Sequence, residues 1–127
     1  LKVAALIIGL ITILGSSIAL MNIMLVSVTE RTREIGTLKA IGADSRSITA
    51  QFLIEAILIG QIGGWIGILL GILLGNIVSL VMHISFVLPV GEMLLAFAIT
   101  FVVGVISGYY PARKAAHLDP IESLRYE

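Results

Sequence analysis

The side chains able to do chemistry are concentrated in one short segment between two long apolar stretches. Within this segment the charged residues are Glu30, Arg31, Arg33, Glu34 and Lys39. Alternating carboxylates and basic groups form ion pairs and charged hydrogen bonds with a partner surface. The chain carries no nucleophile motif, no cluster of metal-ligand type and no glycine-rich phosphate loop. The chemistry predicted for the segment is therefore docking, and catalysis by this chain is not expected.

Basic residues beside a membrane have a second explanation. Juxtamembrane Lys and Arg set topology and contact anionic lipid, which is enough to account for Arg31 and Arg33. A lipid-binding patch is usually free of acids, whereas here Glu30 and Glu34 are interleaved with the bases. On charge alone, lipid contact and the docking of a protein partner both stay open.

An apolar stripe runs through the same segment. Ile35, Leu38 and Ile41 follow one another at three-residue steps, which places them on one face of a helix. Gly42 suits the left-handed residue that ends a helix, and residues 44–45 suit the N-cap of the next one. The pattern predicts a short amphipathic helix that ends near Ile41 and has the form of a helix bound in a protein groove.

The flanking stretches predict that the bilayer is the solvent. The chain has 127 residues, of which 58% are hydrophobic and 13% charged, and its mean hydropathy is +1.10. Soluble domains are about one quarter charged, and a small fold cannot bury so much apolar surface. Zero net charge gives no indication of nucleic acid binding, and the absence of cysteine excludes disulfides. The chain opens with Leu1 rather than Met, which suggests a piece of a longer protein.

Three apolar runs are long enough to cross a bilayer, which takes about 20 residues of helix. They predict spans at 3–28, 48–82 and 92–110, a cytoplasmic loop at 29–47, an external loop at 83–91 and a cytoplasmic tail at 111–127. The helix in the loop either starts at a capping box of Ser27 and Glu30 or continues the first span. The predicted fold class is all-α: a polytopic membrane helix bundle of three transmembrane helices, a short cytoplasmic helix and a C-terminal amphipathic helix.

The second run is long enough to be a hairpin of two short helices, but the charges favour a single crossing. Four of the eight Lys and Arg residues lie in the loop 29–47, and the tail carries Arg113, Lys114 and Arg125. The connection 83–91 has no Lys or Arg. Because basic loops favour the cytoplasm, the loop and the tail share a side, which places the N-terminus outside and the C-terminus in the cytoplasm.

Isolated polar residues and prolines have simple structural explanations. Glu55 lies near the cytoplasmic end of the second span, where an interfacial position is favoured over a proton relay. Asn22 and Asn76 are predicted to form hydrogen bonds between helices. Pro111 is predicted to kink or end the third span, and Asp119 to cap the C-terminal helix.

Glycines form two further patterns. A smooth seam along the second span is made by glycines that recur every four residues, at Gly63, Gly67, Gly71 and Gly75. Gly104 and Gly108 form a matching notch in the third span. Small residues let helix backbones approach closely in lipid, so both sets are predicted to pack helices, within the bundle in preference to a subunit interface.

Several motifs together resemble one family. The sequence MNIMLVSVTERTREIG at 21–36 is similar to the signature of the MacB/FtsX-like permease family of ABC transporters. The resemblance continues through KAIGA at 39–43 and QFLIEA at 51–56, and resumes at YPARKAA, 110–116, and LDPIESLR, 118–125. It covers nearly the whole chain and is closer to the MacB-like members than to the cell-division member FtsX.

The resemblance implies a four-span permease of which this chain supplies spans two to four. Family members act as dimers with two ATPase domains, so ATP and Mg²⁺ are expected on a partner ATPase and no cofactor is expected in this chain. The loop between spans two and three of such permeases sits on the ATPase. Carried over, the coupling role falls on Glu30, Arg31, Arg33, Glu34, Ile35, Gly36, Leu38, Lys39, Ile41 and Gly42.

The resemblance also implies a multi-pass protein of the inner cell membrane that carries ATP-driven conformational work across the bilayer. Such proteins export drugs, peptides or lipoproteins together with a second permease copy and a periplasmic adaptor or outer-membrane component. No polar stripe lines the spans, which agrees with a mechanism that passes motion rather than substrate between them. Two other classes stay open: a structural or regulatory bundle that docks a cytoplasmic partner, and an ion-coupled carrier that uses Glu55.

Overall fold

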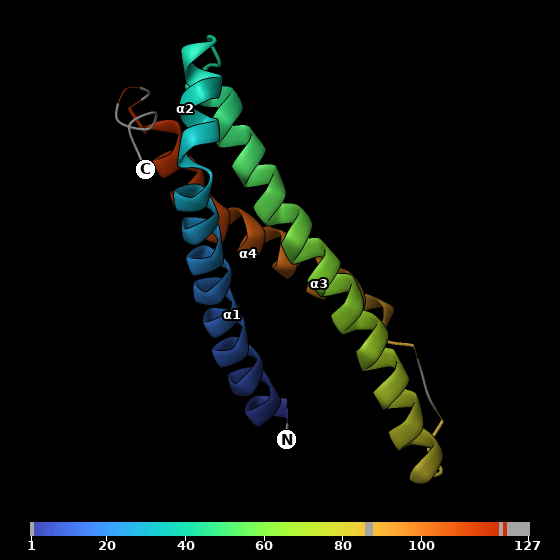
Figure 1. Cartoon of the computed structure of the whole chain (residues 1–127). Helices are drawn as coiled ribbons and strands as arrows, with labels where there is room; N and C mark the ends of the chain where they lie inside the picture. The colour runs from blue at the N-terminus through green and yellow to red at the C-terminus, as the bar shows by residue number, and fades with distance from the viewer. Residues whose placement is uncertain (1, 86–87, 120, 122–127) are drawn as a thin grey trace.

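Helices make up most of the described part of the chain. The computed structural model describes residues 2–85, 88–119 and 121 (Figure 1). Its four helices are α1 (Lys2–Glu30), α2 (Thr32–Ala40), α3 (Ser45–Val81) and α4 (Val90–Ala116). No strand occurs within these residues, which confirms the all-α prediction. The predicted amphipathic helix after residue 119 lies almost entirely outside the described residues.

The three long helices are apolar enough to cross a membrane. α3 is a single uninterrupted helix of 37 residues, so at 1.5 Å per residue it is about 55 Å long. That exceeds the ~30 Å of bilayer hydrocarbon and leaves its first turns free to extend beyond the lipid. The chain therefore passes along α3 once, and the alternative of a helical hairpin in this run is wrong. α2 and the end of α4 lie at one end of the bundle, and the α3–α4 connection lies at the other (Figure 1).

α4 continues further than the sequence indicated. Pro111 was expected to kink the helix or end it, but α4 runs on through this residue to Ala116. Proline lacks the N–H that would bond to the carbonyl of Ser107, and such an interruption costs ~3 kcal/mol in an exposed helix. Here Pro111 is buried together with Ala115 and Ala116, and the packing of this last turn offsets the lost hydrogen bond.

The buried core is confined to the end of the bundle that carries α2. Each helix contributes to it: Met24 and Val28 from α1, Ile35 from α2, Ile48, Phe52 and Ala56 from α3, and Ala112, Ala115 and Ala116 from α4. Along the remaining length the large aliphatic side chains are mostly exposed, as expected for helices surrounded by lipid. The junction around α2 is therefore the best-packed part of the fold.

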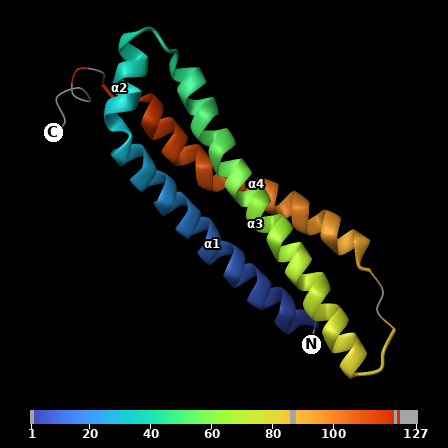
Figure 2. The ribbon, with the colours of Figure 1, turned by 45° about the vertical axis from the view of Figure 1, so that its right-hand side comes forward.

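α4 crosses α3 at a close distance (Figure 2). A Cβ added at Gly60 would lie 3.3 Å from the carbonyl oxygen of Thr100, and one added at Gly104 would lie 3.0 Å from Ile57 Cα. A Cβ at Gly108 would overlap the Cβ of Ala56. Such an approach of two backbones requires residues without side chains at the contact.

The predicted seam on α3 does not take part in this crossing. Apart from the adjacent turns of α3 itself, none of the described residues lies within 4 Å of a Cβ added at Gly63, Gly67 or Gly71. Gly60 and Gly64, on a neighbouring face of the helix, make the contacts with α4 instead. The role of the seam in helix packing stays a prediction, since Gly63 and Gly67 line an apolar groove between α1, α3 and α4 and make no close helix contact.

Polar contacts also join the helices along the apolar spans. The hydroxyls of Ser17 and Ser107 lie 2.7 Å apart, and Gln61 Nε2 lies 3.4 Å from Thr100 Oγ1. Asn22 was predicted to form such a link, as was Asn76, but neither side chain has a hydrogen bond among the residues that the structure describes. Serine and threonine can bond across helices that pack closely, whereas these asparagines lie on exposed faces.

Candidate functional site

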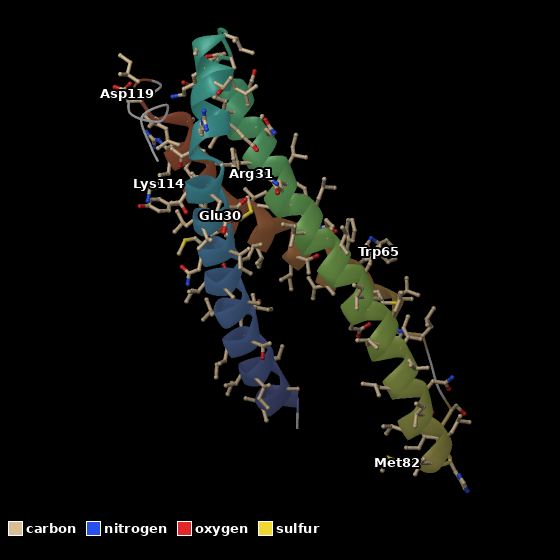
Figure 3. All side chains as sticks on the ribbon, in the orientation of Figure 1. Glu30, Arg31, Trp65, Met82, Lys114 and Asp119 are labelled. Atoms are coloured by element: carbon tan, nitrogen blue, oxygen red, sulfur yellow. The ribbon has the colours of Figure 1, made fainter. Side chains whose placement is uncertain are left out.

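α2 is joined to α1 through a single residue. Arg31 interrupts the helix with φ −96° and ψ 14°, while its N–H still bonds to the carbonyl of Ser27. α1 therefore continues almost directly into α2, which resolves the choice left open by the sequence in favour of continuation. The guanidinium of Arg31, which is labelled in Figure 3, forms an ion pair with Glu55 of α3 at 3.4 Å. The pair places Glu55 at the same end of the bundle as α2.

The C-terminal end of α2 is a Schellman motif. Gly42 has φ +101°, a left-handed conformation that glycine adopts without steric cost. The N–H of Gly42 bonds to the carbonyl of Lys39, and the N–H of Ala43 bonds to that of Leu38. Asp44 is the N-cap residue of α3, although its side chain makes no cap hydrogen bond. The predicted helix end near Ile41 and the predicted cap positions are confirmed.

One face of α2 is used inside the chain. Ile35 is 2% exposed and packs into the core described above, and Gly36 beside it is also buried. Both residues belong to the predicted coupling set, but neither is accessible for direct contact with another protein. Their contribution is to hold α2 against α1, α3 and α4.

Lys39 joins α2 to the end of α4. Its ammonium group donates hydrogen bonds to the carbonyls of Ala116, at 2.5 Å, and Leu118, at 2.7 Å. The hydroxyl of Ser45 donates to the same Ala116 carbonyl at 3.3 Å. The last carbonyls of a helix lack partners within it and carry its negative partial charge, so a lysine there is favourable. Lys39 was predicted as a coupling residue, and its structural role as a cap for α4 has no signal in the sequence.

The rest of the surface of α2 is exposed. Leu38 is 37% exposed, and Ile41, the C-cap residue that follows the helix, is 77% exposed, so of the three residues in the predicted stripe only Ile35 packs into the core. The acids Glu30 and Glu34 and the base Arg33 are exposed as well. None of these three charged side chains forms an ion pair with another residue that the structure describes. The surface is thus an apolar centre with charges of both signs around it, the composition of a protein-docking surface.

The described part of the bundle is also hollowed away from α2. An apolar groove of about 680 Å³ lies between α1, α3 and α4, and its lining includes Ser16, Ala19, Gly63 and Gly67. A second groove, of about 420 Å³, lies between the start of α3 and the end of α4. No three His, Asp or Glu side chains gather as metal ligands within the described ranges.

Comparison with known proteins gives one consistent result. The profile of the family described as FtsX-like permease C-terminal matches residues 6–120. The chain is 48% identical over 120 residues to the macrolide export ATP-binding/permease protein MacB of Bdellovibrio bacteriovorus, and 45% identical over 120 residues to MacB of Syntrophobacter fumaroxidans. It is 47% identical over 118 residues to a probable syringafactin export ATP-binding/permease protein, SyfD, of Pseudomonas syringae pv. syringae.

These relatives are much longer than the present chain. The alignments cover 92–94% of this chain but only 17–18% of the relatives' own length. The chain therefore spans less than one fifth of the length of the curated relatives it matches.

Proposed function

The chain belongs to the FtsX-like permease C-terminal family, and from this membership we propose that it is the membrane part of an ABC transporter that receives motion from an ATPase. The relatives named above are export ATP-binding/permease proteins. By this proposal α2 is the surface on which the ATPase acts. ATP and Mg²⁺ belong to the ATPase, and this chain contributes no catalytic group.

The observation that carries the proposal is the two-sided character of α2. Its inner face is fixed by Ile35 and by the hydrogen bonds from Lys39, whereas its outer face presents Leu38, Ile41 and unpaired charges. A force applied to the outer face would reach α1 through Arg31 and α3 through the short 41–44 turn, and α4 through Lys39. Each of the three spanning helices is therefore directly linked to α2, which carries the docking surface.

The orientation of the chain in the membrane is proposed from the distribution of its charges. The loop that contains α2 holds four of the eight Lys and Arg residues, which supports a cytoplasmic position for α2 and for the end of α4. The N-terminus of α1 and the α3–α4 connection then lie outside. A topology reporter inserted in the connection 83–91 is expected to report an external position, and a cytoplasmic signal would contradict this arrangement.

The substrate and the assembly are proposed from the relatives. Their names include macrolide export and syringafactin export, so a drug- or peptide-type substrate is the class we propose. The open space beside Gly71, which does not line the groove between α1, α3 and α4, supports a further helix or a second copy beside α3. A periplasmic adaptor or an outer-membrane component completes the proposed assembly.

The experiment uses the whole transporter in lipid nanodiscs, with spin labels at exposed Val3 and Leu80 near the ends of α1 and α3. Distances between the labels are measured with and without ATP. Binding of ATP is expected to shift the distance distribution. Glu34→Lys or Gly42→Val is expected to abolish the shift while ATP hydrolysis continues, because the docking surface is altered and the ATPase is not.

The matched control is Glu92→Lys, which makes the same charge change in the first turn of α4, at the opposite end of the bundle. This variant is expected to keep the ATP-dependent shift. A shift that survives both Glu34→Lys and Gly42→Val would contradict the proposed role of α2. No shift in the unmodified protein would favour a structural bundle without a transport cycle.

A further inference from the structure

The second groove combines an apolar end with a basic end. Arg46 and Thr49 from α3 line it together with Tyr109 and Arg113 from α4, and its volume is about 420 Å³. No acidic side chain is among the lining residues in the described part of the chain. Neither arginine forms an ion pair within the described part of the chain, so two positively charged residues line one hollow without a protein counter-charge.

The helix registers fix the order of these residues along the groove. At one end, Ser45 Oγ donates to the carbonyl of Ala116 at 3.3 Å. At the other, a Cβ at Gly108 would lie 3.4 Å from Leu53 Cδ1. Since α3 and α4 run antiparallel there, both arginines lie toward the Ser45 end. Leu53 and Tyr109 lie one to two turns deeper toward the apolar spans.

This arrangement has the polarity of a phospholipid. Guanidinium groups bind phosphate oxygens through paired, charge-assisted hydrogen bonds. Tyrosine favours the boundary between headgroups and hydrocarbon, and Leu53 continues the groove with an aliphatic surface. Basic pockets between transmembrane helices near the cytoplasmic surface are a recognised form of lipid-headgroup site.

We propose that the groove between the start of α3 and the end of α4 binds one anionic phospholipid from the leaflet on the α2 side. Its phosphate lies between Arg46 and Arg113, and an acyl chain follows Leu53 and Tyr109 into the bilayer. A lipid with net negative charge is preferred because two unpaired arginines meet no acid in the groove. The lipid would brace the α3–α4 contact made by Ser45, next to the α2–α4 contact made by Lys39.

The test titrates the whole protein in detergent with phosphatidylglycerol and, separately, with phosphatidylcholine of identical acyl chains. Native mass spectrometry measures the bound lipid at each concentration. Phosphatidylglycerol is expected to bind more tightly to the unmodified protein. Arg46→Gln combined with Arg113→Gln is expected to weaken its binding on the order of twenty- to thirty-fold. Arg46→Lys with Arg113→Lys keeps both charges and is expected to retain most of the affinity.

The control pair is Arg33→Gln with Lys114→Gln, which removes the same charge from exposed residues that do not line the groove. Its phosphatidylglycerol affinity is expected to change less than about threefold, since only the general surface charge falls. An equal loss in the control pair would show that net charge, rather than the groove, attracts the lipid. Equal binding of the two lipids by the unmodified protein overturns the proposal without reference to any variant.

Two other possible occupants of the groove would give different results in these binding experiments. If inorganic phosphate at millimolar concentration displaces phosphatidylglycerol completely, the groove is a phosphate site and the lipid assignment is wrong. If the arginine variants lose contact with an ATPase while their lipid selectivity is unchanged, the groove belongs to a protein interface. Either result overturns the proposal of a bound lipid.

Discussion

Replacing Lys39 by Met removes the ammonium group that caps α4 while the apolar stem of the side chain is kept. The hydrogen bonds to the carbonyls of Ala116 and Leu118 are both lost. A hydrogen bond from a charged group contributes about 1.5–3 kcal/mol. The Ala116 carbonyl retains the hydroxyl of Ser45, at 3.3 Å, and Leu118 is only partly buried and is accessible to water. The expected net loss for the junction of α2 and α4 is therefore about 2 kcal/mol.

Hydrogen exchange at the end of α4 measures this loss locally. The N–H groups of His117 and Leu118 bond to carbonyls of the last turn, so they report its opening. A loss of about 2 kcal/mol predicts exchange roughly thirty-fold faster at these two amides in Lys39→Met. The whole protein is compared in the same detergent or nanodisc, with peptides from the middle of α3 as an internal reference.

Lys114→Met is the matched control. Lys114 is also in the last turn of α4, but it is exposed on the outer side of the helix (Figure 3). Its charge interacts only with the helix dipole, which contributes about 0.3–1 kcal/mol, so a much smaller change in exchange is expected. If the two variants accelerate exchange equally, Lys39 acts through its charge alone, and the inferred clamp between α2 and α4 is wrong.

Two further predictions concern packing and use reversible unfolding in SDS. Gly108→Ala is expected to destabilise the bundle by about 1–3 kcal/mol because the new Cβ overlaps Ala56, whereas Gly71→Ala has open space and should be neutral or stabilising by up to about 1 kcal/mol. A large loss in Gly71→Ala would instead locate a helix partner on the seam. Ile35→Ala is expected to lower the free energy of unfolding by about 2–5 kcal/mol, because this side chain is buried. Ile41→Ala is expected to change it by less than about 0.5 kcal/mol, because this side chain is exposed. Equal losses in the two variants would contradict the description of α2 as a helix with one buried and one exposed side.

The backbone of this protein could be predicted well from its sequence. Long uncharged runs can only be helices in lipid, and the absence of Lys and Arg from 83–91 indicated that α3 crosses once. The end of α2 was predictable because Gly42 and the residues that follow have local conformational preferences. The continuation of α4 beyond Pro111 could not be predicted, because it depends on the burial of the turn that follows, which is a tertiary property; the predicted kink stays a prediction.

The contacts between helices were harder to predict from the sequence. α3 carries glycines on two neighbouring faces, and the four-residue repeat favoured Gly63 and Gly67 although the crossing with α4 uses Gly60 and Gly64. Periodicity finds a smooth face but not the direction in which that face points. The sequence contains no pattern that indicates the role of Lys39. Its hydrogen-bond acceptors are the backbone carbonyls of Ala116 and Leu118, and every residue has a backbone carbonyl.

The measurement closest to the central claim is a photo-crosslink from the exposed face of α2. A benzophenone amino acid replaces Ile41, which is 77% exposed, in the whole transporter with its ATPase present. Mass spectrometry of the crosslinked peptides identifies the contact whether the ATPase is fused or separate. The same amino acid at Leu80, 68% exposed at the other end of the bundle, is the control. The proposal predicts ATPase peptides crosslinked to position 41 and none to position 80. Crosslinks from position 41 to lipid alone would contradict it.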